Sequence, residues 1–513
     1  MSERPVRVRF APSPTGPLHI GGVRTALYNY LFAKKNNGKF LLRIEDTDQK
    51  RFVKGAENYI NESLSWLGMP IDEGVLQGGS FGPYKQSERI DTYAAYADQL
   101  IQAGHAYYAF DTTDELNEMR ANLEANKMSA KYDATSRMSM RNSLTLSDDE
   151  VKDRLDNQDK YIVRIKLPRN EEIRFYDEIR GWIVFNSSQL DDKVLLKEDG
   201  LPTYHLANIV DDHLMEISHV IRGEEWLPSA PLHVMLYKYL GWEDSMPKFA
   251  HLPLILKPDG KGKLSKRDGD RLGFPVFPLE WKSLAGEISS GYRESGYMPE
   301  AVVNMLAMLG WHPSDNQEIF TMEELIKTFS LEKVSKSGAK FDMDKAKWYN
   351  RHYLMKASST ALRAMVDDQV TDVHISKGED YLLEVLEMLK EKVSFAGEIL
   401  PLGQYFFELP EGYDEKVQRK KWKGEVPGYI NDYVIGLVNE NKDTAAEMED
   451  YLEAYANEKG IGKGMLMQPL RWVVSGQAGG PPIFEVLALI GLAEIAKRLE
   501  VVNEKFQQQT GMK

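Results

Sequence analysis

The first residues alternate between apolar and charged positions, a pattern that predicts a strand. Apolar side chains lie on one side and arginines on the other, namely Val6, Val8 and Phe10 against Arg7 and Arg9. A helical pattern begins at Val23, and Asn36-Asn37-Gly38 predicts its end. A second apolar run, from Phe40 to Ile44, predicts another strand that leads into Glu45.

The succession of strand, turn, helix and strand predicts a βαβ unit with a right-handed crossover between parallel strands. The turn is the Pro- and Gly-rich segment APSPTGPLHIGG at residues 11–22. Ligands of such sheets bind beyond the carboxyl ends of the strands. The turn, Arg9 and Glu45 are therefore expected around one crevice.

The pattern changes further along the chain. Residues 105–205 combine charged helical stretches with short strands and a hairpin signal at Asp199-Gly200, as expected of an insertion. Strand-like runs at 219–222 and 251–256 are expected to complete the first sheet. Beyond about residue 295 the pattern is helical, and residues 401–427, rich in Gly, Pro and charge, are expected to form a linker. One apolar helical stripe comprises Leu382, Val385, Leu386 and Leu389.

Composition narrows the class of protein. A chain of 513 residues is too long for a single core, so several domains are expected. The absence of cysteine excludes disulfides, thiolate zinc sites and cysteine nucleophiles, and favours a reducing compartment, the cytoplasm. No apolar run is typical of a signal peptide or of a membrane span.

Charge limits the kinds of partner. The net charge of −14 argues against an extended nucleic-acid coat, because phosphate binding usually requires an excess of Lys and Arg. Any RNA contact is therefore expected to use local basic patches. One candidate is the run from Arg419 to Lys423, for which a solvated helix face is the alternative interpretation.

The turn at residues 11–22 has the features of an anion site. His19, Gly21 and Gly22 lie at the N-terminus of the predicted helix, where free N–H groups and the helix dipole favour a phosphate. The glycines allow close approach to the backbone, and His19 is placed to donate to a phosphate oxygen. The alternative is an ordinary turn with a satisfied histidine.

A lysine-rich segment, KLSKR, follows the last predicted strand of the sheet. Lys263 and Lys266 flank Ser265, and two such cations can close over a leaving polyphosphate and offset its charge. Taken alone, such a segment is usually a solvated surface loop. In this order, at the two ends of an interrupted α/β sheet, the turn and the lysine segment together are far more specific.

In these two segments the sequence resembles the class I aminoacyl-tRNA synthetases, whose signatures HIGH and KMSKS correspond to HIGG and KLSKR. Gly22 stands in place of the last histidine and Leu264 in place of methionine. Glutamyl enzymes commonly have a small residue at that place. The chain is most similar to bacterial glutamyl-tRNA synthetases, and the matching stretches are RFAPSPTGPLHIGG, RIEDTD, GPYKQSER, LPTYHLANIVDDH, VIRGEEW, KLSKR and QPLRWVVSG.

The resemblance implies an α/β, Rossmann-like catalytic domain with an inserted α+β domain that binds the tRNA acceptor end, followed by an all-α C-terminal half. The expected boundaries are 1–105 and 207–256 for the catalytic domain, 106–206 for the insertion, 257–350 for the KLSKR loop and a stem-contact domain, and 351–410 and 411–513 for two helical anticodon-binding domains.

Glutamate has two carboxylates and one ammonium group, so its pocket needs at least two cations and one acid. The resemblance implies a glutamate site of Arg9, Ala11, Ser13, Glu45, Tyr204 and Arg222. It implies an ATP site of His19, Gly21, Gly22, Glu225, Trp226 and Lys266, with His19, Lys263 and Lys266 as catalytic residues. Arg222 is favoured for the side-chain carboxylate, although the division between the two arginines stays open.

The implied reaction is the attack of the glutamate carboxylate on ATP, followed by transfer to the terminal adenosine of tRNA(Glu). ATP is a substrate, Mg²⁺ is expected to assist, and bound tRNA assists the first step. The structural zinc that some relatives hold through cysteines is expected to be absent, no metal-ligating residues are predicted, and a monomer is expected. An anticodon-reading residue is expected near Lys390 and Lys392, without a choice between them.

Two rival functions share part of this sequence signature. A glutaminyl-tRNA synthetase would be expected to have β-barrel anticodon domains, to keep HIGH, and to lack a cation at the Arg222 position. A catalytically inactive tRNA-binding paralogue would not need His19, Lys266 and the pocket residues. Whether the enzyme also glutamylates tRNA(Gln) depends on a few anticodon contacts, and the sequence leaves this open.

Overall fold

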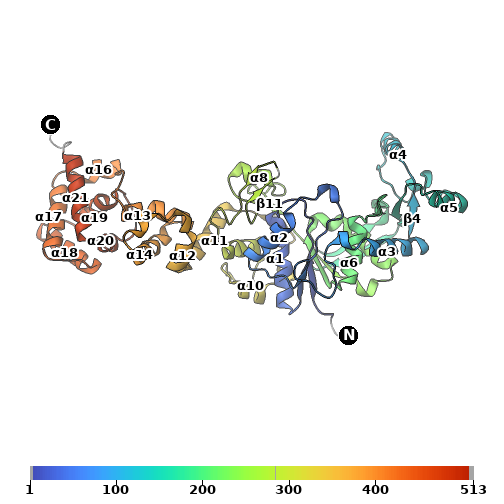
Figure 1. Ribbon diagram of the computed structural model, residues 1–513, viewed down its shortest axis with the longest axis horizontal. Helices are drawn as coiled ribbons and strands as arrows, with labels where there is room; N and C mark the ends of the chain where they lie inside the picture. Colours follow the sequence, from blue (N-terminus) through green and yellow to red (C-terminus); the bar gives the residue numbers. More distant parts are fainter. Residues whose placement is uncertain (1–3, 284, 508–513) are drawn as a thin grey trace. The chain divides into compact units, whose positions relative to one another are not determined.

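The computed structural model describes residues 4–283 and 285–507, and the side chains of Lys266, Asp270 and Gln507 lie outside the described part. The chain divides into two compact units, Met1–Ala346 and Lys347–Lys513. In the described ranges, strands occur in the first unit and the second unit is helical (Figure 1). None of the described helices combines the length and apolar composition needed to cross a membrane.

The predicted βαβ unit is confirmed. β1 (Arg7–Phe10), β2 (Lys39–Leu42) and β3 (Glu73–Gly74) form a parallel sheet in that order, and α1 (Ile20–Lys35) connects the first two strands. The helix begins before Val23, because the side chain of His19 caps it at Ile20. It ends at Asn36, after which Asn37 takes the left-handed conformation with φ 50° that its side chain tolerates.

Both faces of β1 are buried, including the side that carries the two arginines. Parallel strands are usually covered on both faces. Arg7 is paired with Glu73 at 2.7 Å and Arg9 with Asp212 at 2.9 Å, which compensates the charges that the fold removes from water. The alternating residues of β1 are therefore all buried. The apolar side chains pack in the core on one face, and the two arginines form buried ion pairs on the other face.

A second sheet has the strand order β7-β6-β10-β9, formed by β6 (Glu172–Asp177), β7 (Gly181–Asn186), β9 (His219–Gly223) and β10 (Lys248–Leu252). The two sheets adjoin where the Ser218 N–H donates to the Arg7 carbonyl at 2.9 Å. The run at 219–222 is thus a strand beside β1, but the expected single sheet is two adjoining ones. Within the run 251–256, β11 (Ile255–Leu256) leaves the sheet and pairs with β14 (Ala339–Lys340).

Residues 106–206 contribute strands to two different sheets. β4 (Ala106–Ala109), β5 (Ile162–Ile165) and β8 (Val194–Leu196) form a small separate sheet, which carries α4 (Thr113–Ala125) and α5 (Asp148–Asp156) (Figure 1). The hairpin β6–β7, in contrast, extends the sheet of β9 and β10. A turn does occur at Asp199-Gly200, but beyond it the chain makes one bridge, at Pro202, and then enters a helix.

The remaining elements of the first unit enclose these sheets. Tyr93 of α3, Leu206 of α6 and Leu236 of α7 belong to one buried cluster with residues of β4, β5 and β8. The further elements are α2 (Ala56–Trp66), α3 (Ile90–Gln102), α6 (Tyr204–Leu214), α7 (Ala230–Tyr239), α8 (Lys266–Leu272), α9 (Pro299–Met308), α10 (Met322–Thr328), β12 (Trp281–Lys282) and β13 (Ile288–Ser289).

In the second unit, the predicted apolar stripe is confirmed, because its four residues are all fully buried on α14. The expected linker at 401–427 is wrong, since this segment contains α16, whose neighbour Trp422 packs against Trp472. The helices are α11 (Met343–Lys356), α12 (Ser359–Met365), α13 (Asp372–Ile375), α14 (Glu379–Leu389), α15 (Ile399–Leu402), α16 (Glu415–Lys421), α17 (Val426–Asn439), α18 (Ala445–Glu458), α19 (Gly464–Ser475), α20 (Ile483–Ile490) and α21 (Leu492–Gln507).

Candidate active site

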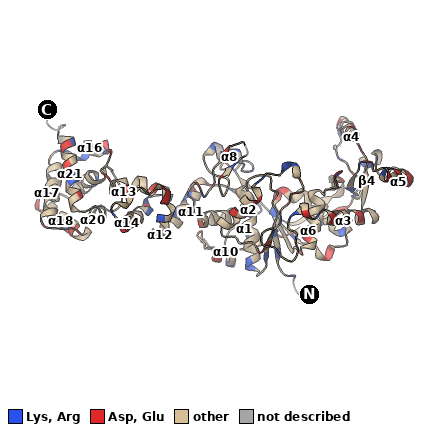
Figure 2. Cartoon of the chain, viewed as in Figure 1, with Lys and Arg blue, Asp and Glu red and all other residues tan. Residues whose placement is uncertain are grey.

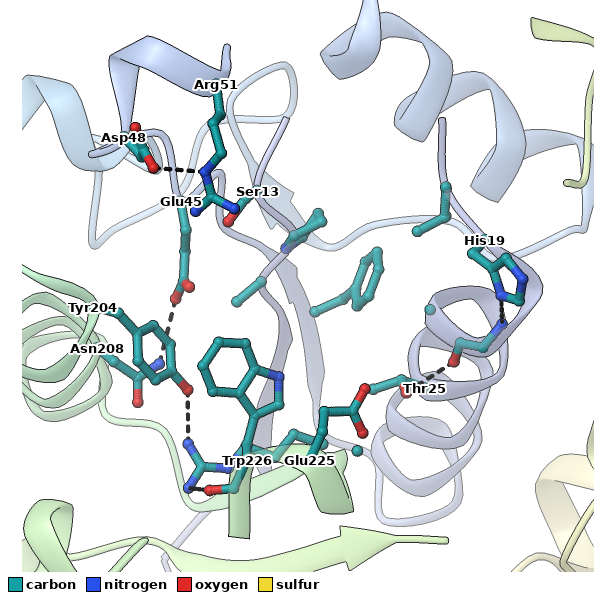
Figure 3. A pocket seen from close by; sticks show the side chains of 18 of the residues that line it. Ser13, His19, Thr25, Glu45, Asp48, Arg51, Tyr204, Asn208, Glu225 and Trp226 are labelled. Carbon is teal, nitrogen blue, oxygen red and sulfur yellow. Dashed lines mark hydrogen bonds and ion pairs between the residues drawn. The ribbon is translucent and has the colours of Figure 1, made fainter. Parts of the chain in front are cut away.

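A cavity of about 1070 Å³ lies beyond the carboxyl ends of β1 and β9, beside the N-terminus of α1 (Figure 3). This is the edge at which ligands of parallel sheets are expected. The side chain of Lys266 lies outside the described part of the structure. All the other predicted site residues line the cavity, namely Arg9, Ala11, Ser13, His19, Gly21, Gly22, Glu45, Tyr204, Arg222, Glu225, Trp226 and Lys263.

His19 provides a neutral hydrogen-bond donor at the cavity wall. Its Nδ1 accepts from the Gly21 N–H at 3.2 Å, so in the neutral ring the proton is on Nε2. Nε2 is buried and has no partner among the described residues. Burial, followed by the positive charge of Lys263, lowers the pKa of His19 to about 4, and the ring is therefore neutral at pH 7.

The first backbone N–H groups of α1 are already occupied. The Ile20 N–H donates to the Val276 carbonyl at 2.9 Å, and the Gly22 N–H donates to the His19 carbonyl at 2.8 Å. The Gly21 N–H is taken by the His19 ring. The expectation of free N–H groups at this helix N-terminus is therefore wrong, and the dipole and the Nε2–H of His19 are what it offers to an anion.

Gly22 occupies a position where a side chain would meet close packing. A Cβ atom added there would lie 2.7 Å from Leu18 Cδ1 and 3.8 Å from the Phe10 ring. A histidine at this place would have to displace Leu18, which itself lines the cavity. The glycine therefore avoids a contact with the terminal methyl group of Leu18.

Arg222 is a buried cation whose recorded partners are all neutral. Its Nη1 donates to the Tyr204 hydroxyl at 2.8 Å and lies 3.3 Å from Nδ1 of His233, while its Nε donates to Nε2 of His251 at 3.0 Å. Its Nη2 lies 3.5 Å from the Trp226 carbonyl. Only 5% of Arg222 is exposed, so its charge is removed from water, and no carboxylate among the described side chains contacts it. Such a site favours an anionic ligand.

Tyr204 and Trp226 form an aromatic wall next to Arg222. Their rings are 4.3 Å apart between centroids and tilted by 36°. Figure 3 shows both rings at the cavity, and the Tyr204 hydroxyl accepts from Nη1 of Arg222. The wall excludes water from one side of Arg222, which strengthens its attraction for a carboxylate.

Arg9 differs from Arg222 because its positive charge is compensated by the carboxylate of Asp212. Asp212 accepts from Nε of Arg9 at 2.9 Å and from Nη1 of Arg43 at 2.7 Å, and Arg43 in turn pairs with Glu45 at 3.0 Å. Burial raises the pKa of Glu45 despite the opposing effect of the arginines. Asn208 lies 3.3 Å from Glu45 Oε1 (Figure 3). Acid and cation are thus held side by side at one end of the cavity.

Lys263 forms an ion pair with another residue of the cavity lining. Its Nζ lies 2.7 Å from Glu225 Oε1, and both side chains are about half exposed, at 55% and 43%. Ser265 and Asp268 form a capping box that begins α8 at Lys266. The KLSKR segment therefore starts a helix and is not a featureless loop.

Several residues at or behind the cavity were missed in the sequence reasoning. Asn208 lines it, and Asp212 and Arg43 hold Arg9 and Glu45 in place. His233 and His251 hold Arg222. Asn208 and Asp212 lie within the stretch LPTYHLANIVDDH and could have been weighed with it, whereas His251 has no signal in the sequence beyond its place on an apolar strand.

The two candidate lysines of the second unit have different surroundings. Lys390 donates to the Ala357 carbonyl at 3.1 Å and pairs with Glu387 at 2.6 Å. Lys392 is exposed. The basic residues of the run from Arg419 to Lys423 are exposed at the end of α16, on either side of the buried Trp422. Figure 2 colours the Lys and Arg positions of the chain blue.

With this geometry in place, comparisons with known proteins give the class. The family model described as "tRNA synthetases class I (E and Q), catalytic domain" matches residues 5–348, and the model "Anticodon binding domain" matches residues 354–502. The chain belongs to the glutamyl and glutaminyl group of class I aminoacyl-tRNA synthetases.

Within this group, two curated relatives match this chain over nearly its full length. "Glutamate--tRNA ligase" from Cytophaga hutchinsonii is 55% identical over 97% of both chains, and the protein of that name from Parabacteroides distasonis is 53% identical over 98% of this chain and 99% of its own length. A solved glutamate tRNA ligase from Elizabethkingia meningosepticum, in complex with its amino acid, superposes with a TM-score of 0.92 at 48% identity, covering 98% of this chain and 99% of that one.

Proposed function

We propose that the protein is a glutamate–tRNA ligase, which activates L-glutamate with ATP and transfers it to tRNA(Glu). The observation that carries this proposal is Arg222, a buried cation at the cavity wall whose recorded partners are all neutral. A dicarboxylic amino acid supplies the missing charge. Relatives about half identical over nearly the full length support the same reaction.

Glutamate is proposed to bind across the cavity. Arg222 receives the side-chain carboxylate, because it has no carboxylate of its own. Arg9 is already compensated by Asp212 and is better suited to orient the α-carboxylate than to neutralise it. Glu45 receives the ammonium group, while Ala11, Ser13 and Tyr204 complete the site.

ATP is proposed to lie between α1 and the KLSKR segment. The α-carboxylate of glutamate attacks the α-phosphorus in line, and glutamyl-adenylate and pyrophosphate form without a protein nucleophile. The Nε2–H of His19, which has no partner among the described residues, is proposed to stabilise charge on the phosphates. Lys263 and Lys266 act on the departing pyrophosphate, and Gly21, Gly22, Glu225 and Trp226 border the nucleotide. Each such contact contributes about 3 kcal/mol of transition-state stabilisation.

Magnesium is proposed to enter with the nucleotide. Mg²⁺ usually binds through phosphate oxygens and keeps several water molecules. In the described ranges, no group of three His, Asp or Glu side chains is arranged to hold a metal ion. The carboxylates that line the cavity are Glu45, Asp48, Asp199 and Glu225, and Glu225 is paired with Lys263.

The second step is proposed to use the 2′-hydroxyl of the terminal adenosine of tRNA. Residues 106–206 are proposed to receive the acceptor end, and the helical second unit the anticodon, in keeping with the model that matches residues 354–502. Lys392 is the better candidate for an anticodon contact, because Lys390 is already engaged. The protein is proposed to act as a monomer in the cytoplasm.

An ATP–pyrophosphate exchange assay in the presence of tRNA tests this function. We expect exchange that depends on glutamate, and we expect Arg222→Leu to lower kcat/KM for glutamate by about 100-fold or more. Lys248→Leu, at the exposed first residue of β10 and outside the cavity, is the control and should leave the rate unchanged. Exchange supported by glutamine would indicate a glutaminyl enzyme, and no exchange would indicate an inactive paralogue.

Aminoacylation of purified tRNA(Glu) and tRNA(Gln) then defines the RNA substrate. Charging of both would show an enzyme that ignores the anticodon difference, and charging of tRNA(Glu) alone would show a selective one. Lys392→Ala should weaken charging by raising KM for tRNA, without an effect on KM for glutamate.

A further inference from the structure

Three neighbouring strands carry a connected row of buried polar side chains behind the cavity. Asp177 ends β6, His251 lies on β10, and Arg222 lies on β9. These strands are adjacent in the order β7-β6-β10-β9, and Arg222 and His251 are direct register partners. Asp177 Oδ2 lies 2.6 Å from Nδ1 of His251, whose Nε2 lies 3.0 Å from Nε of Arg222.

The chemistry of these groups fixes where the protons are. A guanidinium group has only donors, so Nε2 of His251 must accept from Arg222. In a neutral ring the proton is then on Nδ1, which donates to Asp177. Asp177 also accepts from the backbone N–H groups of Ile179 at 3.0 Å and Arg180 at 2.9 Å. These bonds hold the carboxylate in one orientation, and the ring with it.

Burial keeps the His251 ring neutral. His251 and Asp177 are both fully buried, and burial lowers the pKa of His251 to about 4 even though the bond to Asp177 raises it. His233, on the other side of Arg222, has its pKa lowered well below the usual value, first by burial and then by Arg222. No second cation therefore faces the guanidinium group from either histidine at pH 7.

The contacts also define which side of Arg222 is turned to the cavity. Nε is held by His251, which does not line the cavity. The two Nη atoms contact Tyr204 and Trp226, which do. A carboxylate at the Nη side would accept from Arg222, whereas the NH₂ of an amide side chain would present a donor to donors.

We propose that Asp177 and His251 form a positioning dyad, which fixes the orientation of Arg222 and thereby sharpens the preference for glutamate over glutamine. Asp177 selects the tautomer of His251, and His251 holds Nε of Arg222 so that its donors point into the cavity. The inference rests on the proposed function, since it assigns a role to residues behind the same arginine. Neither residue touches a substrate.

The first test is His251→Phe, which keeps a ring but removes the acceptor for Arg222. KM for glutamate in tRNA-dependent pyrophosphate exchange should rise by about 10- to 100-fold, as expected for loss of one hydrogen bond to a charged group. KM for ATP should change by less than about 3-fold, since His251 does not line the cavity. The ratio of kcat/KM for glutamate to that for glutamine should fall.

Two further variants separate positioning from general packing. His251→Gln retains an amide oxygen that can accept from Arg222 and an NH₂ that can donate to Asp177, so it should restore most of the affinity lost in His251→Phe. Asp177→Asn removes the charge that selects the tautomer and should raise KM for glutamate in the same way as His251→Phe. His105→Phe is the matched control, because His105 stacks on Tyr239 outside the cavity.

The outcomes are distinct. If the unaltered protein shows no glutamate-dependent exchange, the proposed function fails, and the dyad with it. If it is active and His251→Phe leaves both KM for glutamate and the discrimination against glutamine unchanged, the dyad fails alone. Should His251→Phe not fold, His251→Gln decides, since a rise in its KM beyond about 10-fold would show that an acceptor at this place is not sufficient.

Discussion

Asp212 holds Arg9 through two hydrogen bonds, from Nε at 2.9 Å and from Nη2 at 3.1 Å, and also accepts from Arg43 at 2.7 Å. Asp212 thus contacts two arginines that come from neighbouring strand ends, and Arg43 is in addition paired with Glu45 at 3.0 Å. Arg9 and Arg222 line the same cavity, yet among the described side chains Arg9 has a carboxylate partner and Arg222 has none. This asymmetry distinguishes the two arginines more clearly than their positions in the sequence.

Removal of the charge on Asp212 should therefore destabilise the first unit. Asp212→Asn leaves two buried arginines short of one compensating charge, and the free energy of unfolding should fall by about 3 kcal/mol. Denaturant unfolding of the full chain, followed by tryptophan fluorescence, measures this loss. Asp244→Asn, at an exposed position, should change stability by less than about 0.5 kcal/mol. Equal stability of the two variants would contradict the role given to Asp212.

The two nitrogen atoms of His19 should have separable roles. His19→Asn keeps an acceptor suited to cap α1 but has no donor at the Nε2 position, so kcat for exchange should fall by about 100- to 1000-fold with little loss of stability. His19→Ala removes both functions and should cost about 1 kcal/mol of stability in addition. An unchanged kcat in His19→Asn would show that Nε2 does not act on the phosphates.

The neutral state of His19 gives a pH prediction. Burial lowers its pKa to about 4, so protonation, which would add a cation near Lys263, begins only as the pH falls toward that value. Above about pH 5.5 the donor on Nε2 is unaffected by pH. The pH–rate profiles of the unaltered protein and of His19→Asn should therefore have the same shape between about pH 6 and 8. A limb near pH 6.5 that disappears in His19→Asn would contradict the neutral assignment.

The ion pair of Lys263 with Glu225 should matter for catalysis and not for stability. Both side chains are about half exposed, and exposed pairs contribute about 0 to 1 kcal/mol. Lys263→Met should leave the unfolding transition unchanged while lowering kcat for exchange by about tenfold or more. Lys261→Met, two residues earlier at an exposed position, is the control. A loss of stability without a change in kcat would assign Lys263 a structural role instead.

Much of the fold follows from local patterns in the sequence. The alternation at 6–10, the stop at Asn36-Asn37-Gly38 and the stripe on α14 each depend on side chains a few residues apart, and strand, helix and stripe formed where expected. The prediction of a linker at 401–427 was wrong, because the composition of this segment does not reveal that Trp422 packs against Trp472, which is fifty residues further along the chain. Likewise, the place of β6–β7 in the sheet of β10 depends on a partner strand far along the chain.

For the site, the sequence by itself determined which residue types could bind a dicarboxylic amino acid and a triphosphate, because those types and their order are written in the chain. Only the tertiary structure decided how each is used. The first N–H groups of α1 have acceptors within the protein, and Nε2 of His19 has no partner among the described residues. Arg9 is paired with a carboxylate, whereas the described partners of Arg222 are neutral. The physical reason is that burial and charge compensation depend on contacts between distant segments, such as Asp177, Arg222 and His251, which no local pattern contains.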